Sequence, residues 1–123
     1  MADAVAERVR ERERLVGLAR DYVAHLAVRH EVVAAAVVGS VARGDFNVWS
    51  DVDVVVVVEH LPDRVPDRAT LLAQHVPAGV QPVGFTPAEF RTAWTKGNPL
   101  VRETAAGIAL LGEGFLRLVA SGG

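Results

Sequence analysis

Two runs of small and β-branched apolar residues constrain this chain more than any other feature. Residues 32–38 are all valine or alanine, and residues 54–58 are all valine. β-Branched side chains favour strands, and an apolar run without alternation is typical of a strand buried on both faces. Gly39 ends the first run after about two turns, too early for a helix. The sequence therefore predicts two neighbouring buried strands.

Periodicity and turn residues predict the other elements. An apolar stripe over residues 4–29 predicts a long helix, whose charged first half we expect to face solvent. Pro82 indicates an edge position or a bulge for its strand, and Thr86 and Glu89 form a capping box that begins a helix. The remaining expected elements are helices at 67–75, 86–94 and 99–107, strands at 80–85 and 108–111, and a helical or frayed tail after residue 114. We expect an α+β fold, a small mixed β-sheet with helices packed mainly on one face.

Composition limits the functional classes. The 123 residues are enough for a single domain spanning 1–123, and a formal charge of −2 argues against a dedicated duplex-binding protein. No cysteine is present, which excludes disulfides and thiolate metal sites. The charged N-terminal stretch is unlike a signal peptide, and no apolar run is long enough for a membrane span. We expect a cytoplasmic protein.

A glycine-serine turn follows the first strand. Gly39 lets the backbone approach a phosphate closely, and Ser40 can add a hydroxyl donor. Residues 40–43 are expected to form one helical turn that points free N–H groups at the same place, with Gly44 in a left-handed conformation at its end. Such a turn is common on its own and mostly structural.

Two aspartates open the second strand. Asp51 and Asp53 lie on one face, about 6.5 Å apart along the strand. Carboxylates at this spacing suit one or two divalent cations, and oxygen-only ligation favours Mg²⁺ or Mn²⁺ over zinc. An acidic pair alone more often just caps a strand. Together, however, the turn and the pair offer a phosphate cradle beside a metal site, as nucleotidyl transfer requires.

The spaced motif resembles a known family. Gly39-Ser40, ten residues, then Asp51-Val52-Asp53 is similar to the signature of the DNA polymerase beta-type nucleotidyltransferases, and more closely of the minimal (MNT-type) members. The resemblance implies Mg²⁺-dependent transfer of AMP from ATP to a hydroxyl, with both aspartates as metal ligands. Gly39, Ser40 and Arg43 would contact the triphosphate. It also implies an antitoxin in a toxin–antitoxin system, whose partner is a HEPN-type toxin and whose acceptor is a tyrosine of that toxin.

One departure from this family pattern concerns the third carboxylate. The superfamily places an acid on the strand that carries Gln81, and an amide at that position can ligate weakly but cannot take a proton. Glu59 lies six residues beyond the aspartate pair, about 20 Å along the strand, which is too far. Glu89 belongs to the capping box. Asp45 is a candidate stand-in that fits an ordinary surface loop equally well.

Three functions remain open at this point. The first is an enzyme that adenylylates a partner protein. The second, motivated by Gln81, is a catalytically impaired antitoxin that neutralises its partner by binding alone. The third is an antibiotic-modifying nucleotidyltransferase, although such enzymes usually carry an extra substrate domain. Trp49, in the loop before the aspartates, is a candidate for stacking on a base, although a loop tryptophan more often anchors its loop to the core.

Overall fold

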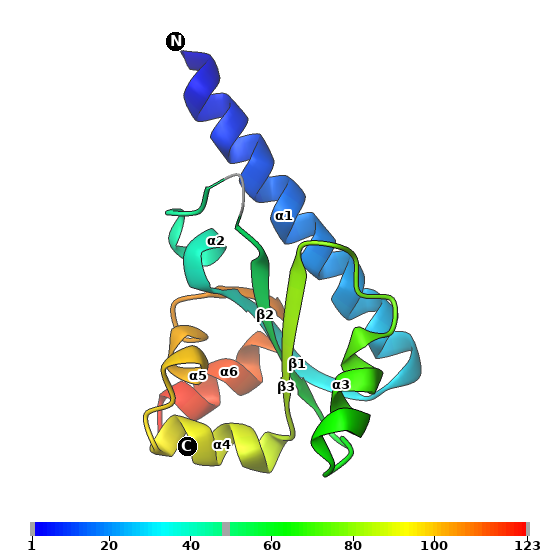
Figure 1. The fold of residues 1–123 in the computed structure, drawn as a ribbon. Coiled ribbons are helices and arrows are strands. Elements are labelled where there is room, and N and C mark those ends of the chain that lie inside the picture. Colours follow the sequence, from blue (N-terminus) through cyan, green and yellow to red (C-terminus); the bar gives the residue numbers. More distant parts are fainter. Residues whose placement is uncertain (1, 48–49, 123) are drawn as a thin grey trace.

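The computed structural model describes residues 2–47 and 50–122 (Figure 1). Trp49 therefore lies outside the described residues. The helices are α1 (Ala2–Arg29), α2 (Gly39–Arg43), α3 (Val65–Ala73), α4 (Pro87–Thr95), α5 (Pro99–Glu103) and α6 (Glu113–Ala120), and the strands are β1 (Val32–Val38), β2 (Val52–Val58), β3 (Val80–Phe85) and β4 (Ile108–Leu111). Of the helices in the described part of the chain, none has the apolar length needed to cross a membrane.

The strands form one mixed four-stranded sheet in the order β3-β2-β1-β4. β1 pairs antiparallel with both β2 and β4, whereas β2 and β3 run parallel. The two apolar runs thus occupy the central positions, where every residue can be covered on both sides. β3, which contains Pro82, is an edge strand, as its proline predicted.

Helices cover both faces of this sheet, so the expectation that they pack mainly on one face is wrong. Alternate residues of β2 belong to two separate cores. Val54 and Val56 pack with residues of α1 and α3, while Val55 and Val57 pack with residues of α4, α5 and α6. The unbroken valine run fits this arrangement, because a strand that is apolar on both faces is fully buried only where both faces are covered. The α+β class and the mixed sheet are confirmed.

The helix expected to reach residue 107 ends earlier, at Glu103. The buried Thr104 hydroxyl donates to the carbonyl oxygen of Val101 at 2.6 Å, and residues 104–106 form a turn. Competition from a hydroxyl for backbone acceptors is a common way to end a helix. The chain is then free to enter β4 directly from this turn.

The charged half of α1 supports the short helix α2. Arg12 donates from Nε to the Val41 carbonyl at 2.9 Å and from Nη2 to the Ala42 carbonyl at 2.6 Å. Arg8 donates to the carbonyl of Gly44 at 3.0 Å. These carbonyls have no partner within a helix so short, and cations are favourable at a helix C-terminus. The expected solvent-facing stripe therefore includes two arginines that fix α2 against α1.

Arg12→Ala should lower the free energy of unfolding by about 1–2 kcal/mol, because two carbonyl oxygens lose a charged donor. Urea denaturation followed by circular dichroism measures this change. The matched control is Arg14→Ala, which removes only an exposed ion pair with Glu11 and should change the stability little. Equal losses in the two variants would contradict the supporting role of Arg12.

Candidate functional site

The Asp53 carboxylate lies directly against the turn that follows β1. The antiparallel register places Val38 opposite Asp53, so Gly39 begins beside this side chain. Gly39 has φ +73, and a Cβ built on it would lie 2.6 Å from Oδ2 of Asp53. An L side chain is disfavoured at this φ and has no room there. The glycine turn and the second aspartate, which the sequence placed at neighbouring strand ends, are thus in contact.

Asp51 and Gln81 extend the site toward the sheet edge. The parallel register pairs Asp53 with Gln81, and the Gln81 amide donates from Nε2 to Oδ2 of Asp51 at 3.2 Å. Asp51 and Gln81 are exposed and Asp53 is half-buried. Asp53 shares its strand parity with Val55, so it points to the face covered by α4, α5 and α6. An amide, rather than an acid, therefore neighbours the aspartates on the third strand.

The helical turn α2 has the expected form. Gly44 adopts φ 86, and its N–H donates to the Ser40 carbonyl at 2.8 Å, which ends the turn in a left-handed conformation. Ser40 is half-buried, and its hydroxyl has no hydrogen-bond partner among the described residues. This hydroxyl is therefore available to a ligand beside Asp53.

Arg43 and Glu103 complete the surroundings of the turn. Arg43 donates from Nη1 to Oε1 of Glu103 at 2.7 Å and from Nε to Oδ2 of Asp45 at 3.2 Å. The same Glu103 oxygen accepts from the backbone N–H of Gly39 at 3.1 Å. Sequence reasoning placed Arg43 here but missed Glu103, which lies 64 residues beyond Gly39.

The signal that would have located Glu103 is the pairing of the last strand. β4 runs antiparallel to β1, with Ile108 opposite Val37. Residues just before Ile108 must then lie near residues just after Val37, which brings the end of α5 to Gly39. The strand itself was predicted, but its partner in the sheet was not, and without the partner the position of Glu103 is undetermined.

Burial and neighbouring charges shift the pKa of the Asp53 carboxyl. Partial burial raises the pKa of the Asp53 carboxyl, and the negative charges of Asp51 and Glu103 raise it further, while Arg43 opposes the shift. A cation placed between the two aspartates would remove part of this repulsion. The ionised form of Asp53 is therefore disfavoured in the protein alone, and a positively charged ligand would stabilise it.

The chemistry of these donors fits a magnesium or manganese ion that is shared with a substrate. Mg²⁺ is commonly bound through one or two carboxylates together with substrate phosphates. Asp51 and Asp53 would supply the carboxylates, and the side-chain oxygen of Gln81, whose amide nitrogen donates to Asp51, would be a further weak ligand. Within residues 2–47 and 50–122 no group of three His, Cys, Asp or Glu side chains is close enough to hold a metal by itself. Phosphate oxygens would have to complete the coordination.

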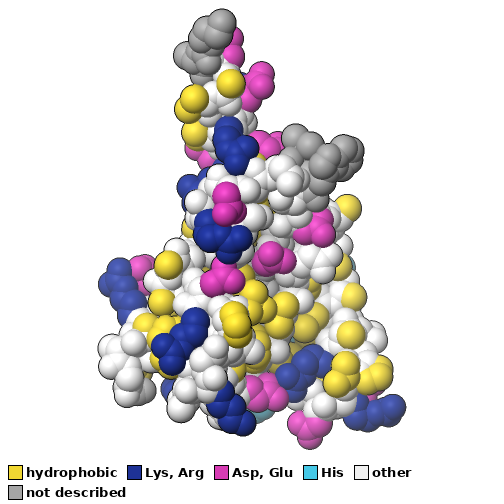
Figure 2. Space-filling model, turned by 60° about the vertical axis from the view of Figure 1, so that its left-hand side comes forward, with side chains coloured by type: hydrophobic (Ala, Val, Ile, Leu, Met, Phe, Trp, Pro, Cys, Tyr) yellow, Lys and Arg dark blue, Asp and Glu magenta, His cyan; other side chains and the backbone are white. Residues whose placement is uncertain are grey.

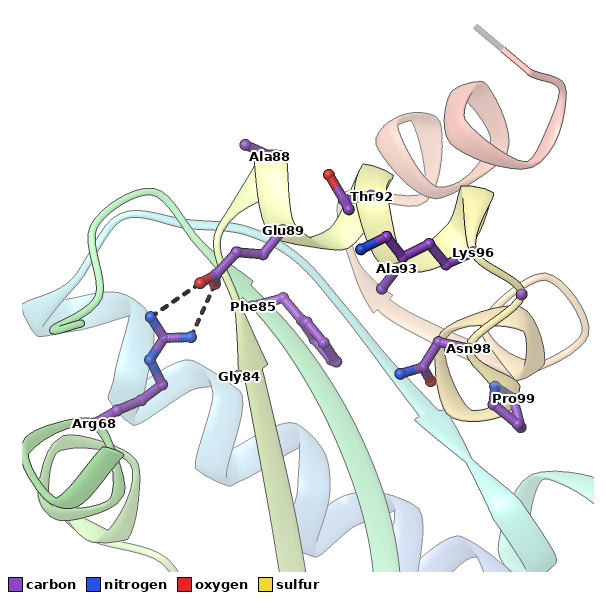
Figure 3. A pocket seen from close by; sticks show the side chains of 11 residues that line it. Arg68, Gly84, Phe85, Ala88, Glu89, Thr92, Ala93, Lys96, Asn98 and Pro99 are labelled. Atoms are coloured by element: carbon purple, nitrogen blue, oxygen red, sulfur yellow. Dashed lines mark hydrogen bonds and ion pairs between the residues drawn. The ribbon is translucent and has the colours of Figure 1, made fainter. Parts of the chain in front are cut away.

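The other candidate acids have ordinary roles. Asp45 pairs with Arg43. Glu89 completes the capping box with Thr86 and forms an ion pair with Arg68 at 2.8 Å, drawn in Figure 3. Glu59 is exposed just beyond the C-terminal end of β2, whereas the aspartates lie at its beginning. None of these three contacts the aspartate pair in the described structure.

A groove of about 740 Å³ lies at the other end of β3. It is lined by Gly84 and Phe85 from the end of the strand, by α4 and by the start of α5, and the Phe85 ring points into it (Figure 3). Phe85 is four residues beyond Gln81, about 13 Å along the strand. Figure 2 shows hydrophobic side chains gathered on this face below a group of acidic and basic ones. The groove is thus separate from the aspartates but reached from them along one strand.

Comparisons with known proteins bear on the sequence family and on the fold of this chain. Residues 19–87 match a family model described as the nucleotidyltransferase domain. The matched segment contains the turn, both aspartates and Gln81 but ends before Glu103. A protein from Sulfolobus solfataricus, provisionally named a nucleotidyltransferase, has a similar fold, with a TM-score of 0.61, 24% identity, and coverage of 67% of this chain and 76% of that chain. A search of curated proteins found no match.

Gly39→Ala should destabilise the protein by about 1–3 kcal/mol, because the new Cβ meets the Asp53 carboxylate at a backbone conformation unfavourable for alanine. Urea denaturation measures the loss. Gly114→Ala is the matched control. A Cβ at Gly114 meets nothing within 4 Å, and Gly114 lies in α6, where alanine adopts the backbone conformation readily. A Gly39→Ala protein as stable as the native one would show that the contact is not tight.

Asp53→Asn should raise the stability at neutral pH. The folded-state pKa of Asp53 lies above the unfolded value, so the native state binds more protons between the two values and stability falls as pH rises through them. The amide cannot ionise, and the gain should vanish below the ordinary aspartate pKa. Melting temperatures measured from about pH 3 to pH 8 test this, with Asp67→Asn on the exposed face of α3 as control. A pH-independent difference would contradict it.

Proposed function

Because this chain belongs to the nucleotidyltransferase domain family, we propose that it transfers AMP from ATP to a hydroxyl group of a partner protein. The observation that supports this most is the contact between the Asp53 carboxylate and the Gly39 turn. It places a carboxylate that can hold a cation next to backbone and hydroxyl groups that can hold phosphate oxygens. Phosphoryl and nucleotidyl transfer depend on this combination.

Each site residue has a role in this proposal. Asp51 and Asp53 would hold Mg²⁺ or Mn²⁺, and the ion would supply positive charge that stabilises the charge developing on the phosphate oxygens. The free Ser40 hydroxyl and the Gly39 N–H donate to the triphosphate. Arg43 adds a guanidinium, whose planar fork suits phosphate oxygens. These assignments coincide with the roles that the family resemblance implies.

The arrangement also indicates the side from which the acceptor hydroxyl would approach the nucleotide. The pyrophosphate would lie against α2 and Arg43, on the β1 side of the aspartates, so the acceptor must approach from the β3 side. There, Gln81 is exposed and Val83 is 37% exposed, which leaves this approach open. The acceptor oxygen forms a bond to the α-phosphorus as the bond to the bridging oxygen breaks and pyrophosphate leaves. The hydroxyl proton passes to water, because the Gln81 amide cannot accept it.

The open side suits a macromolecular acceptor. The groove at Phe85 lies farther along β3, about 13 Å from Gln81, and its volume lies within the range of binding pockets. A partner seated on this surface would bring a hydroxyl to Asp51 without a substrate pocket built by this chain alone. The family resemblance implies that this partner is a HEPN-type toxin and that the acceptor is one of its tyrosines, which would make this protein an antitoxin.

The transfer itself is tested with ATP labelled at the α-phosphate, Mg²⁺ and a co-expressed HEPN partner. We expect label on the partner, and a loss of at least about 100-fold in rate for Asp51→Asn and for Asp53→Asn, since each removes a metal ligand. Asp67→Asn should transfer at the native rate. No transfer by the native protein to an intact, active partner would refute the proposal.

A second candidate function is neutralisation by binding alone, which the presence of Gln81 favours. In that case the Asp51→Asn, Asp53→Asn double variant should still neutralise the partner, whereas an enzyme should not. The Gln81→Asp variant also separates the transferase from the protein that acts by binding alone, through a gain of activity rather than a loss. If transfer is limited by a missing base, the new carboxylate should raise the rate at least about tenfold.

A further inference from the structure

The Glu103 carboxylate accepts hydrogen bonds from two donors that a bound triphosphate would also need. Its Oε1 accepts from the Gly39 N–H at 3.1 Å and from Nη1 of Arg43 at 2.7 Å. A carboxylate oxygen between a backbone N–H and a guanidinium has the same contacts that a phosphate oxygen would make there. Glu103 and a phosphate group cannot share these donors, because both are acceptors and both are negative.

The backbone that carries Glu103 is held firmly, whereas its side chain is not. The Asn98 side chain accepts from the Val101 N–H at 3.1 Å at the start of α5, and Val101 is fully buried. β4 then fixes the chain through the pairing of Ile108 with Val37. The Glu103 side chain is 36% exposed, so it can rotate into solvent without moving α5.

A purely structural role for Glu103 accounts less well for this geometry. The turn is already fixed by the carbonyl contacts of Arg12 and by the Gly44 cap. Glu103 adds a third negative charge near Asp51 and Asp53, which raises the electrostatic cost of the site in the absence of a ligand. A structural carboxylate would be expected to lower that cost.

We propose that Glu103 is an internal competitor that determines which ligands enter the phosphate site. This inference rests on the triphosphate site of the proposed function. A magnesium-bound triphosphate or pyrophosphate offers several oxygens and can replace the single Glu103 oxygen on both Gly39 and Arg43. The carboxylate then turns to solvent and returns to these donors as pyrophosphate leaves, so it selects for polyphosphates and assists product release.

Calorimetry with magnesium pyrophosphate and with a non-hydrolysable ATP analogue tests the competition. Glu103→Gln should bind both about five- to tenfold more tightly than the native protein, since affinity is reduced by the fraction of molecules in which the donors are occupied. Glu113→Gln is the matched control, because Glu113 forms an exposed ion pair with Arg117 on α6, and its affinity should be unchanged. Unchanged or weaker binding by Glu103→Gln would overturn the proposal.

A second measurement uses the native protein and needs no variant. The amide resonance of Gly39 and the side-chain carboxyl resonance of Glu103 should both shift when magnesium pyrophosphate is added, because the hydrogen bond between them is exchanged for one to the ligand. A shift of Gly39 with Glu103 unmoved would show that the carboxylate stays in place and would also overturn the proposal.

These outcomes are distinguishable from failure of the proposed function. Tighter binding by Glu103→Gln without label transfer to any partner supports the competitor and refutes the transferase. Label transfer by the native protein together with weaker binding by Glu103→Gln supports the transferase and refutes the competitor. Glu103 would then be a residue that stabilises the phosphate site. Failure of every variant to bind pyrophosphate and the ATP analogue refutes both.

Discussion

The candidate site depends on one close approach, that of the Asp53 carboxylate to Gly39. The antiparallel register of β1 and β2 places Val38 opposite Asp53, and only a residue without Cβ can continue the chain past the carboxylate. A register shift of one residue would point Asp53 to the other face of the sheet. The two central strands therefore form the core and also position the site, because their pairing brings Gly39 next to Asp53.

Local features of the sequence predicted most of the fold. The strands, the edge position of β3, the capping box at Thr86 and the left-handed Gly44 all follow from interactions within a few residues. We expected the helices mainly on one face, although valine runs that are apolar on both faces require cover on both. The runs do not record which helix covers which face, because they contain no alternation of polar and apolar residues.

The residues of the candidate site also divide into those that the sequence predicted and those that it did not. Gly39, Ser40, Asp51 and Asp53 belong to one continuous stretch, and their closeness could be inferred from two adjacent strands. Glu103 could not, since its place depends on β4 joining the sheet beside β1, and either edge of the sheet was open to a last strand before the structure was known. Arg43 was predicted as a contact to phosphate, but its present partners are Asp45 and Glu103. The sequence thus predicted the donors of the site and not the acceptor that occupies them.

This distribution of charge bears on how a nucleotide would enter. Arg43 divides its positive charge between two carboxylates, and Asp53 already lies in the field of Asp51 and Glu103. A free triphosphate would meet mostly negative groups, and like charges at short range oppose binding. Under our proposal, a nucleotide that arrives with a divalent cation would reverse this, because the aspartates would attract the cation while the phosphates would displace Glu103 from Gly39 and Arg43. The acidic pair would then serve first to admit the nucleotide as its metal complex, and only afterwards to assist the transfer of its α-phosphate.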